Sequence, residues 1–450
     1  MVDKLLIRAY SVGVGDCIHV TIPKARKDGA DFHILIDCGT RGKGAVLKLA
    51  VDHLKAKLPK VDGKRRLDLL LVSHEHEDHI KGFDPDWFKD VKIENLWMSV
   101  AMNRKHPQAK FKHKLHDDVA LAMRSIAARN LSLSPELQDI MARYSIGNDG
   151  AVTALTDTLP KQNKIDPLYV HAGLPAAKLK PETLAGATFK VFGPQENIDY
   201  YYLGKDAGDV VQTFALASAG ALRSPSAAAA LDTAPPANIS GTDFRRLRSR
   251  MMSNVFAFAE EEGEVVNNTS VILLIEWRGR RLLFVGDAEW NGAYVEGKKN
   301  FAWNVAWKKH KTELGKPVDF LKIGHHGSTN STPWNDREDG KQTEPSTILD
   351  TILPRPKGTK KPTAMAIVST DRTKYDPIPK SPLLLEIGSR VSNTRNYLSL
   401  LGDDRARTLP LYAEYERQWL DKPQPWRTDI ETMISGDVFV EVAIEPASGH

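Results

Sequence analysis

The stretch "LLLVSHEHEDHIKGF" at residues 69–83 has three histidines and three carboxylates in the six positions 74–79, directly after an apolar run. The local concentration is high, because the whole chain has 14 histidines. In an extended chain every second side chain points in the same direction, so His74 and His76 face one side. The spacing His-x-His-x-Asp-His indicates a metal site, and a hydrated turn after a strand is the less favoured interpretation.

The six positions have room for ligands of two ions. His74 and His76 can bind one metal ion, while Asp78 and His79, at the start of the next element, can bind a second. Imidazole nitrogen and carboxylate oxygen are ligands that zinc, manganese and iron accept. On the same alternation Glu75 and Glu77 point away from the metals, and we interpret them as solvated groups or as groups that support the ligands.

The composition indicates a globular protein. The 450 residues are 41% hydrophobic and 26% charged, which suffices for a large core. No uninterrupted apolar span has membrane length, and Lys4, Arg8 and Asp16 interrupt the first apolar residues, unlike the core of a signal peptide. We therefore expect a soluble, cytoplasmic protein.

Only two cysteines are present, Cys17 and Cys38, and they form no Cys-x-x-Cys pair. Two cysteines cannot make a disulfide framework, so we predict buried thiols in strands. Metal ligands must then come from histidine and aspartate.

The hydrophobic pattern predicts a mixed α/β chain whose two halves each supply several strands. Helical spacing occurs at 43–58 and 116–131. Residues 216–237 are rich in Ala, Pro and Ser, which favours a mobile loop or linker over a short Ala-rich helix. The strand-like apolar runs are 5–10, 17–22, 32–39, 67–73, 187–193, 270–277, 281–286, 319–324, 364–369 and 438–444.

The second half of the chain has matching polar residues just past strand ends. Asp287 follows the run "RLLFVG", and His325 and His326 follow "DFLKIG". Loops at strand ends converge at one edge of layered α/β folds and commonly hold site residues. We expect these side chains to meet the histidine loop.

Five stretches, taken together and in this order, resemble the metallo-β-lactamase-fold hydrolases, and more narrowly the hydrolase domain of the ComEC-type competence proteins. The resemblance implies an αββα sandwich, a single domain over 1–450, with 90–265 as a variable insertion. The stretches are "SVGVGDCIHV" (11–20), "ILIDCG" (34–39), "VSHEHEDHIKG" (72–82), "NNTSVILLIEWRGRRLLFVGDAE" (267–289) and "LKIGHHGSTNST" (321–332), and "AIVSTDRTKYDPIP" (366–379) is a weaker sixth.

The resemblance also implies a role for each matching residue. Asp287 bridges the two ions, and Asp37 supports the histidine loop from beneath. Asp78 and His325 are the predicted catalytic residues: Asp78 holds the second ion, and His325 contacts the substrate's oxyanion or phosphate. The reverse assignment of His325 and His326 stays open. The metal ligands implied are His74, His76, Asp78, His79, Asp287 and His326.

The chain departs from the family pattern at two places. Many active relatives have a third histidine on the first metal, and the candidates here are His106, His113, His116 and His171. A first site completed by water, or absent, is the alternative. At 374–376 the chain has Lys-Tyr-Asp where similar proteins often have a histidine.

The ligand set predicts hydrolysis by metal-activated water, with two divalent ions that are zinc or, alternatively, manganese. The resemblance and local basic clusters at 244–252, 307–311 and 357–361 favour a phosphodiester, either nucleic acid or a nucleotide. The densest basic cluster contains Arg245, Arg246, Arg248 and Arg250. A lactone, lactam or thioester hydrolase is the second hypothesis, and a non-catalytic binding or sensory protein is the third.

Overall fold

The structure is a computed structural model. It describes residues 3–109, 148–201, 265–328, 330–334, 343–357, 360–370, 381–392, 394–395, 427–428 and 438–449. Several predicted features lie outside the described residues: the helix over 116–131, the loop over 216–237, the arginines of 244–252, the candidates His113 and His116, and residues 374–376.

The first large sheet has seven strands in the order β17-β1-β2-β3-β6-β8-β9. Strands β17, β1, β2 and β3 pair antiparallel, and β3, β6, β8 and β9 pair parallel. Parallel pairing brings the carboxyl ends of these last four strands to one edge. The bounds are β1 Leu5–Tyr10, β2 Cys17–Ile22, β3 Phe32–Cys38, β6 Leu69–Val72, β8 Leu96–Ser99, β9 Leu168–Val170 and β17 Phe439–Ile444.

The second large sheet has five strands in the order β10-β11-β12-β13-β14. It is also mixed, because β10, β11 and β12 pair antiparallel whereas β12, β13 and β14 pair parallel. The bounds are β10 Thr188–Gly193, β11 Ile272–Trp277, β12 Arg280–Phe284, β13 Phe320–Lys322 and β14 Met365–Ile367.

Two small sheets and several helices complete the described elements. The small sheets are β4 Lys60–Val61, β5 Lys64–Leu67 and β7 Val91–Ile93, and β15 Thr394–Arg395 with β16 Arg427–Thr428. The α-helices are α1 Gly44–Lys57, α2 Glu77–Ile80, α5 Asn148–Thr153, α6 Leu159–Asn163, α10 Ala302–Leu314, α11 Glu344–Ile352 and α12 Ser381–Gly388. Short 3₁₀ or π segments are η1 Val100–Met102, η2 Ala154–Thr158, η3 Ile198–Tyr201 and η4 His325–Gly327.

The two large sheets share one apolar core. Ile34 and Ile36 of β3 belong to the same cluster as Leu273 and Ile275 of β11, so alternate residues of each sheet face the other sheet. Strand β3 is buried along its whole length, which requires cover on both of its faces.

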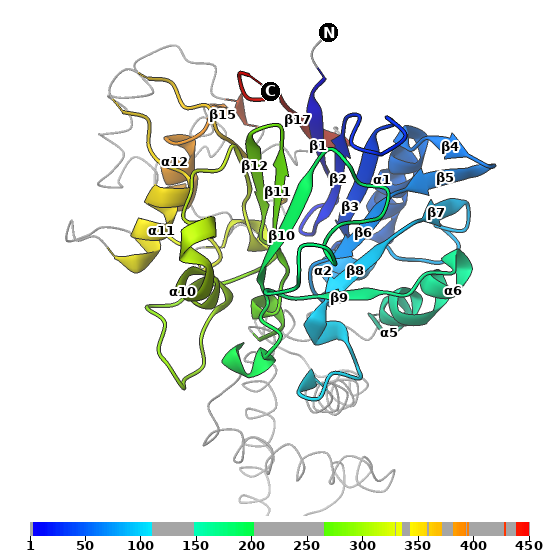
Figure 1. Ribbon diagram of the computed structural model, residues 1–450, viewed down its shortest axis with the longest axis horizontal. Helices are drawn as coiled ribbons and strands as arrows, with labels where there is room; N and C mark the ends of the chain where they lie inside the picture. The colour runs from blue at the N-terminus through cyan, green and yellow to red at the C-terminus, as the bar shows by residue number, and fades with distance from the viewer. Residues whose placement is uncertain are drawn as a thin grey trace, which may run out of the picture.

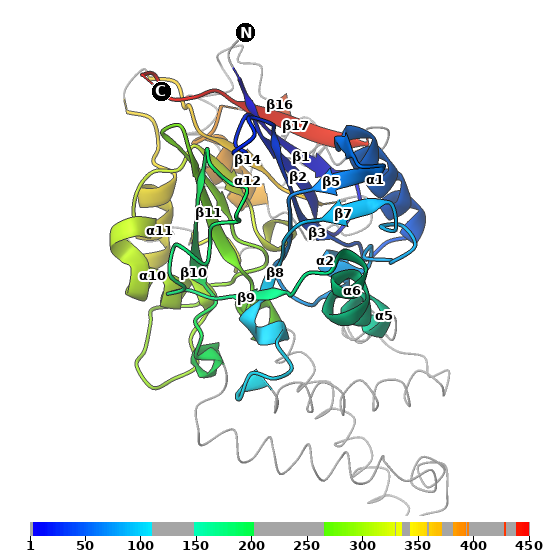
Figure 2. The ribbon, with the colours of Figure 1, turned by 45° about the vertical axis from the view of Figure 1, so that its right-hand side comes forward.

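Helices cover the outer faces of the sheets, as Figures 1 and 2 show. Leu35 of β3 contacts the cluster of Leu47 and Val51 of α1 on one side of the molecule. On the other side, Leu274 of β11 shares a cluster with Trp303 of α10. The prediction of a mixed α/β chain is therefore confirmed, with mixed sheets flanked by helices.

Each predicted strand run contains a strand of the structure, and α1 agrees with the helix predicted over 43–58. Cys17 at the start of β2 and Cys38 at the end of β3 are buried neighbours, with their Sγ atoms 3.8 Å apart, as predicted for thiols in strands. No helix within the described part of the chain combines the length and apolar character needed to cross a membrane.

Candidate metal centre

The centre forms where strand ends from both sheets meet. The chain leaves β6 at Val72 and turns into the histidine loop and α2, while Asp287 follows β12, and His325 and His326 follow β13. Strands β12 and β13 are parallel, so both ends lie at the same edge. The tertiary structure therefore brings together side chains more than 200 positions apart.

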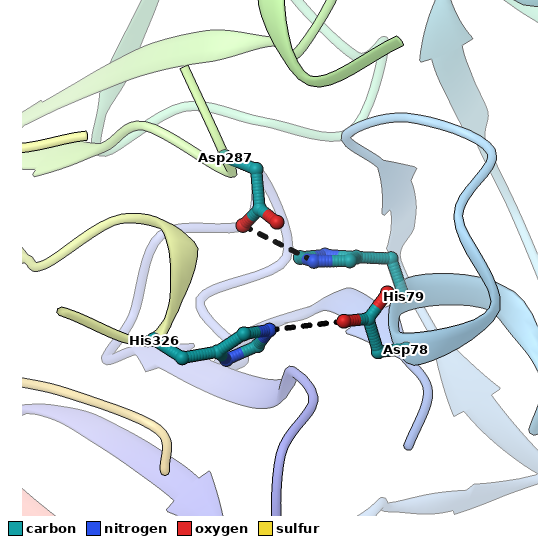
Figure 3. Close-up of side chains that lie close together, drawn as sticks. All are labelled: Asp78, His79, Asp287 and His326. Carbon is teal, nitrogen blue, oxygen red and sulfur yellow. Dashed lines mark hydrogen bonds and ion pairs between the residues drawn. The ribbon is translucent and has the colours of Figure 1, made fainter. Parts of the chain in front are cut away.

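The first of two buried groups contains Asp78, His79, Asp287 and His326, each no more than 1% exposed. Figure 3 shows these side chains pointing toward one another. His79 Nε2 lies 3.2 Å from Asp287 Oδ1, and His326 Nε2 lies 3.1 Å from Asp78 Oδ2. One ligand atom from each residue lies within 4.8 Å of the others, so the four residues can surround a single ion.

The second group contains His74, His76 and again Asp287, also with ligand atoms within 4.8 Å of one another. His74 Nε2 lies 3.0 Å from His76 Nδ1 and 3.8 Å from Asp287 Oδ2. Asp287 thus turns Oδ1 toward one group and Oδ2 toward the other. All six residues predicted to bind metal are brought together in these two adjoining groups, which we call the His79 group and the His74 group.

Asp37 holds the histidine loop in place from beneath. Its carboxylate accepts hydrogen bonds from the Ser73 amide at 2.7 Å and the Ser73 hydroxyl at 2.6 Å, and lies 2.8 Å from His79 Nδ1. Because Nδ1 of His79 is engaged by Asp37, Nε2 is left facing Asp287. A carboxylate behind a metal-binding histidine orients the ring in the same way. Asp37 itself has a φ of 55°, an uncommon conformation for a residue other than glycine.

Gly39 lets the ligand loop approach the sheet closely. A Cβ at this position would lie 2.2 Å from the Asp78 carbonyl carbon and the His79 amide nitrogen, so no larger residue fits there. The neighbouring Asp16 accepts from the Gly39 amide at 2.8 Å through its carbonyl, and its own amide donates to the Asp78 carbonyl at 2.9 Å. The backbone of Asp78 is therefore fixed as well as its side chain.

A buried ion pair beneath the centre was not predicted from the sequence. Lys322 Nζ of β13 lies 2.9 Å from Asp16 Oδ1, and each of the two residues is 1% exposed. Asp16 also lies near Asp37 and His79 in a third group of possible ligands. Because the Lys322 ammonium already neutralises Asp16, we interpret that third group as structural. Asp16 lies in the stretch "SVGVGDCIHV" (11–20) that carries part of the resemblance, but no role was predicted for it.

Burial keeps the imidazoles of the His74 group neutral. It lowers the pKa of His74 well below its ordinary value and lowers that of His76 to about 3. Neutral imidazole is the form that binds metal, so these two rings need lose no proton at neutral pH to become ligands.

In the His79 group, neighbouring charges outweigh burial in setting the pKa values of the two carboxylates. Burial would raise the pKa of Asp78, but the charge of Arg41, whose Nε lies 2.8 Å from Oδ2, and the contact with His326 bring it well below the ordinary range. Burial would likewise raise the pKa of Asp287, but His79 and His325 lower it strongly. Both carboxylates are therefore ionised and able to attract a cation.

His326 and His325 face different parts of the centre. His326 Nδ1 donates to the Ser369 carbonyl at 2.8 Å, which leaves Nε2 directed at Asp78. His325 places Nε2 3.9 Å from Asp287 Oδ2 and Nδ1 3.3 Å from Glu289 Oε1. The structure thus groups His326 with the predicted second-metal ligands. Glu289 is a site residue that the sequence interpretation missed.

Of the two alternatives predicted for Glu75, a solvated group and a group that supports the ligands, burial of its side chain excludes the first. Glu77 lies in the first turn of α2 and pairs with Lys81 at 2.6 Å, one helical turn away. Neither glutamate belongs to the His79 group or the His74 group, in agreement with the prediction that both point away from the metals.

Of the four candidates for a third histidine on the first ion, the two that the structure describes do not join the His74 group. His106 and His171 are described and belong to neither group, and His171 Nδ1 lies 2.9 Å from the Ala172 carbonyl.

The basic cluster 307–311 lies on α10, where Lys308, Lys309 and Lys311 are exposed and lie over aromatic rings.

Comparison with known proteins gives no match: no protein-family model matches the chain, and neither does any curated protein. The geometry of the centre is therefore the basis on which its function is interpreted.

Proposed function

We propose that this protein is a metal-dependent hydrolase of the metallo-β-lactamase fold that uses two divalent ions to activate water. The observation that carries the proposal is the pair of adjoining buried ligand groups that share Asp287. A carboxylate that turns one oxygen to each group suits a bridge between two cations. Two-metal hydrolases are built in this way.

The arrangement of the elements supports the fold assignment. Two mixed sheets share a core, helices cover their outer faces, and the ligands follow strand ends at one edge. This arrangement is consistent with the αββα order that the resemblance implies. The sequence order of the ligand motifs agrees with it.

The donor set fits zinc, with manganese as the alternative, because it consists of imidazole nitrogens and carboxylate oxygens. His74, His76 and Asp287 would hold the first ion, and Asp78, His79, Asp287 and His326 the second. Bound ions would supply Lewis acidity and lower the pKa of water. The chain's own part is orientation: Asp37 fixes the His79 ring, Ser369 fixes the His326 ring, and Arg41 orients the Asp78 carboxylate.

For the substrate we propose a phosphodiester, either nucleic acid or a nucleotide. The support is the resemblance to the ComEC-type domain together with the exposed lysines at 308, 309 and 311. Hydrolysis of a lactone, lactam or thioester would use the same ions, and a binding or sensory protein could keep the fold without catalysis.

The test combines metal analysis with a substrate panel. Full-length protein purified without chelator is expected to contain about two zinc or manganese ions per chain, or to take them up on titration. The loaded protein is then assayed with bis(p-nitrophenyl) phosphate, single- and double-stranded DNA, a lactone and a thioester. Turnover of a phosphodiester supports the proposal, whereas turnover confined to the lactone or thioester replaces the substrate class. Binding of no ion would overturn the hydrolase proposal.

A further inference from the structure

We propose that His325, oriented by Glu289, is the third protein ligand of the first metal ion, an inference that rests on the proposed two-metal function. It replaces the oxyanion contact predicted for His325 from the sequence. It also removes the need for a third histidine from the segment between the histidine loop and Asp287.

The backbone of the two histidines is the first support. His325 and His326 have φ values of 44° and 54°, a left-handed conformation that residues other than glycine rarely adopt and still more rarely adopt twice in succession. The turn sets the two rings 6.1 Å apart, with His326 toward Asp78 and His325 toward Asp287. Such strain persists where the surrounding structure requires it, and sites are where it concentrates.

The second support is the oxygen that His325 faces. Asp287 Oδ2 is buried and has no hydrogen-bond partner among the described residues. Two imidazole nitrogens approach it, His74 Nε2 at 3.8 Å and His325 Nε2 at 3.9 Å. Ligand atoms that share one zinc-like ion lie roughly 3–4 Å apart, since each bond is about 2.0–2.2 Å long. Each of the two nitrogens is therefore at a distance from Asp287 Oδ2 that suits two ligands of one ion.

The third support is Glu289, which is 1% exposed and lies behind His325. Its carboxylate accepts hydrogen bonds from three side-chain amides, those of Asn267 and Asn330 at 2.9 Å and Asn268 at 3.0 Å. Oε1 lies 3.3 Å from His325 Nδ1, so Nε2 is the nitrogen left to face Asp287.

The arrangement resembles the one behind His79, although Glu289 makes an ion-pair contact with His325 at 3.3 Å and no hydrogen bond to its Nδ1. There Asp37 lies 2.8 Å from Nδ1 and Nε2 faces Asp287 Oδ1. A carboxylate that engages the far nitrogen of a histidine is the usual support of a metal ligand. Asp287 thus lies between two carboxylate-backed histidines, one for each ion.

The experiment is a titration of the metal-free full chain with Co²⁺, followed by visible absorption and by metal analysis after gel filtration. Wild-type protein is expected to bind two ions in two steps. His325→Ala should retain the second ion with unchanged affinity and lose the step for the first, while Glu289→Gln should weaken the first step by about 10–100-fold. His171→Ala is the matched control and should bind two ions like the wild type. Circular dichroism and thermal melting verify that each variant is folded.

Two unaltered binding steps in His325→Ala would overturn the inference and leave the two-metal proposal intact. A wild-type chain that binds fewer than two ions would overturn both. If His325→Ala does not fold, Glu289→Gln decides, because it keeps the size of the side chain and one of its two acceptor oxygens: an unchanged Co²⁺ spectrum and affinity at the first step would contradict the proposal.

Discussion

Two sets of buried histidines, one in the candidate metal centre and one within the seven-stranded sheet, differ in the groups that surround them. In the metal centre, His79 contacts Asp37 and Asp287. Within β2 and β3, His19 and His33 stack with ring centroids 5.4 Å apart, and Nε2 of His19 lies 3.1 Å from Nδ1 of His33. Among the described residues neither of these two rings has a carboxylate as hydrogen-bond partner. Burial of histidine alone therefore does not make a metal site, and the convergent carboxylates decide which set can hold a cation.

The largest expected effect follows removal of the charge shared by the two groups. Asp287→Asn keeps the size of the side chain but leaves an uncharged amide where two cations would meet. We expect loss of at least one bound ion and a fall in kcat of at least about 100-fold, with the fold preserved. Metal analysis and turnover of the identified substrate measure this. Asp52→Asn, on the exposed face of α1, is the control, and wild-type turnover in Asp287→Asn would contradict the two-metal mechanism.

The second prediction concerns Asp16, the carboxylate that is neutralised by Lys322 and not by a metal ion. Lys322→Met removes the cation from a buried pair and leaves Asp16 uncompensated, which is expected to cost about 3–5 kcal/mol of unfolding free energy. Denaturant unfolding measures this cost. The double variant Asp16→Asn/Lys322→Met should recover much of the loss, because no buried charge is then left unpaired. Equal stabilities of the single and double variants would contradict this account of the pair.

A smaller effect is expected for Asp37, which supports the ring of His79. Asp37→Asn keeps the size of the side chain but removes the charge behind His79 and one of the two acceptor oxygens, so the affinity for the second ion should fall about 10–100-fold. The first ion should bind as before, since Asp37 lies next to His79 and outside the His74 group. Competition of the loaded protein with a zinc-chelating dye measures the two affinities separately. Equal weakening of both ions would point to a general loss of structure.

The smallest effect concerns the histidines that lack carboxylates. Burial lowers the pKa of His33 to about 4 from an ordinary value of 6.5, so the folded state keeps this ring neutral. Its contribution to stability is therefore complete above pH 6.5 and is lost as the pH falls from 6.5 toward 4. At pH 5.5 one such group is expected to lower the unfolding free energy by about 1 kcal/mol relative to its value above pH 6.5. Urea unfolding of wild type and His33→Gln at pH 7.5 and 5.5 measures it, and the variant should show the weaker pH dependence.

The sequence alone predicted the longer strands and most of the candidate metal ligands. Strands such as β2 and β3 are predicted because their apolar runs are local, and His74, His76, Asp78 and His79 are predicted because their spacing is local. Strand β8 was missed, since a run of four residues gives too little pattern to recognise. Asp287 and His326 were recognisable only because each follows a clear strand.

Only the tertiary structure decided which distant side chains meet. Lys322 and Asp16 are 306 positions apart, and Glu289 reaches His325 through a fold in which β12 and β13 lie side by side. The left-handed turn at His325 and His326 likewise has no local signature, because its strain is offset by contacts with Asp78, Asp287 and Glu289. Sequence pattern reports local periodicity and spacing, whereas the pairing of buried charges depends on how the two sheets pack against each other.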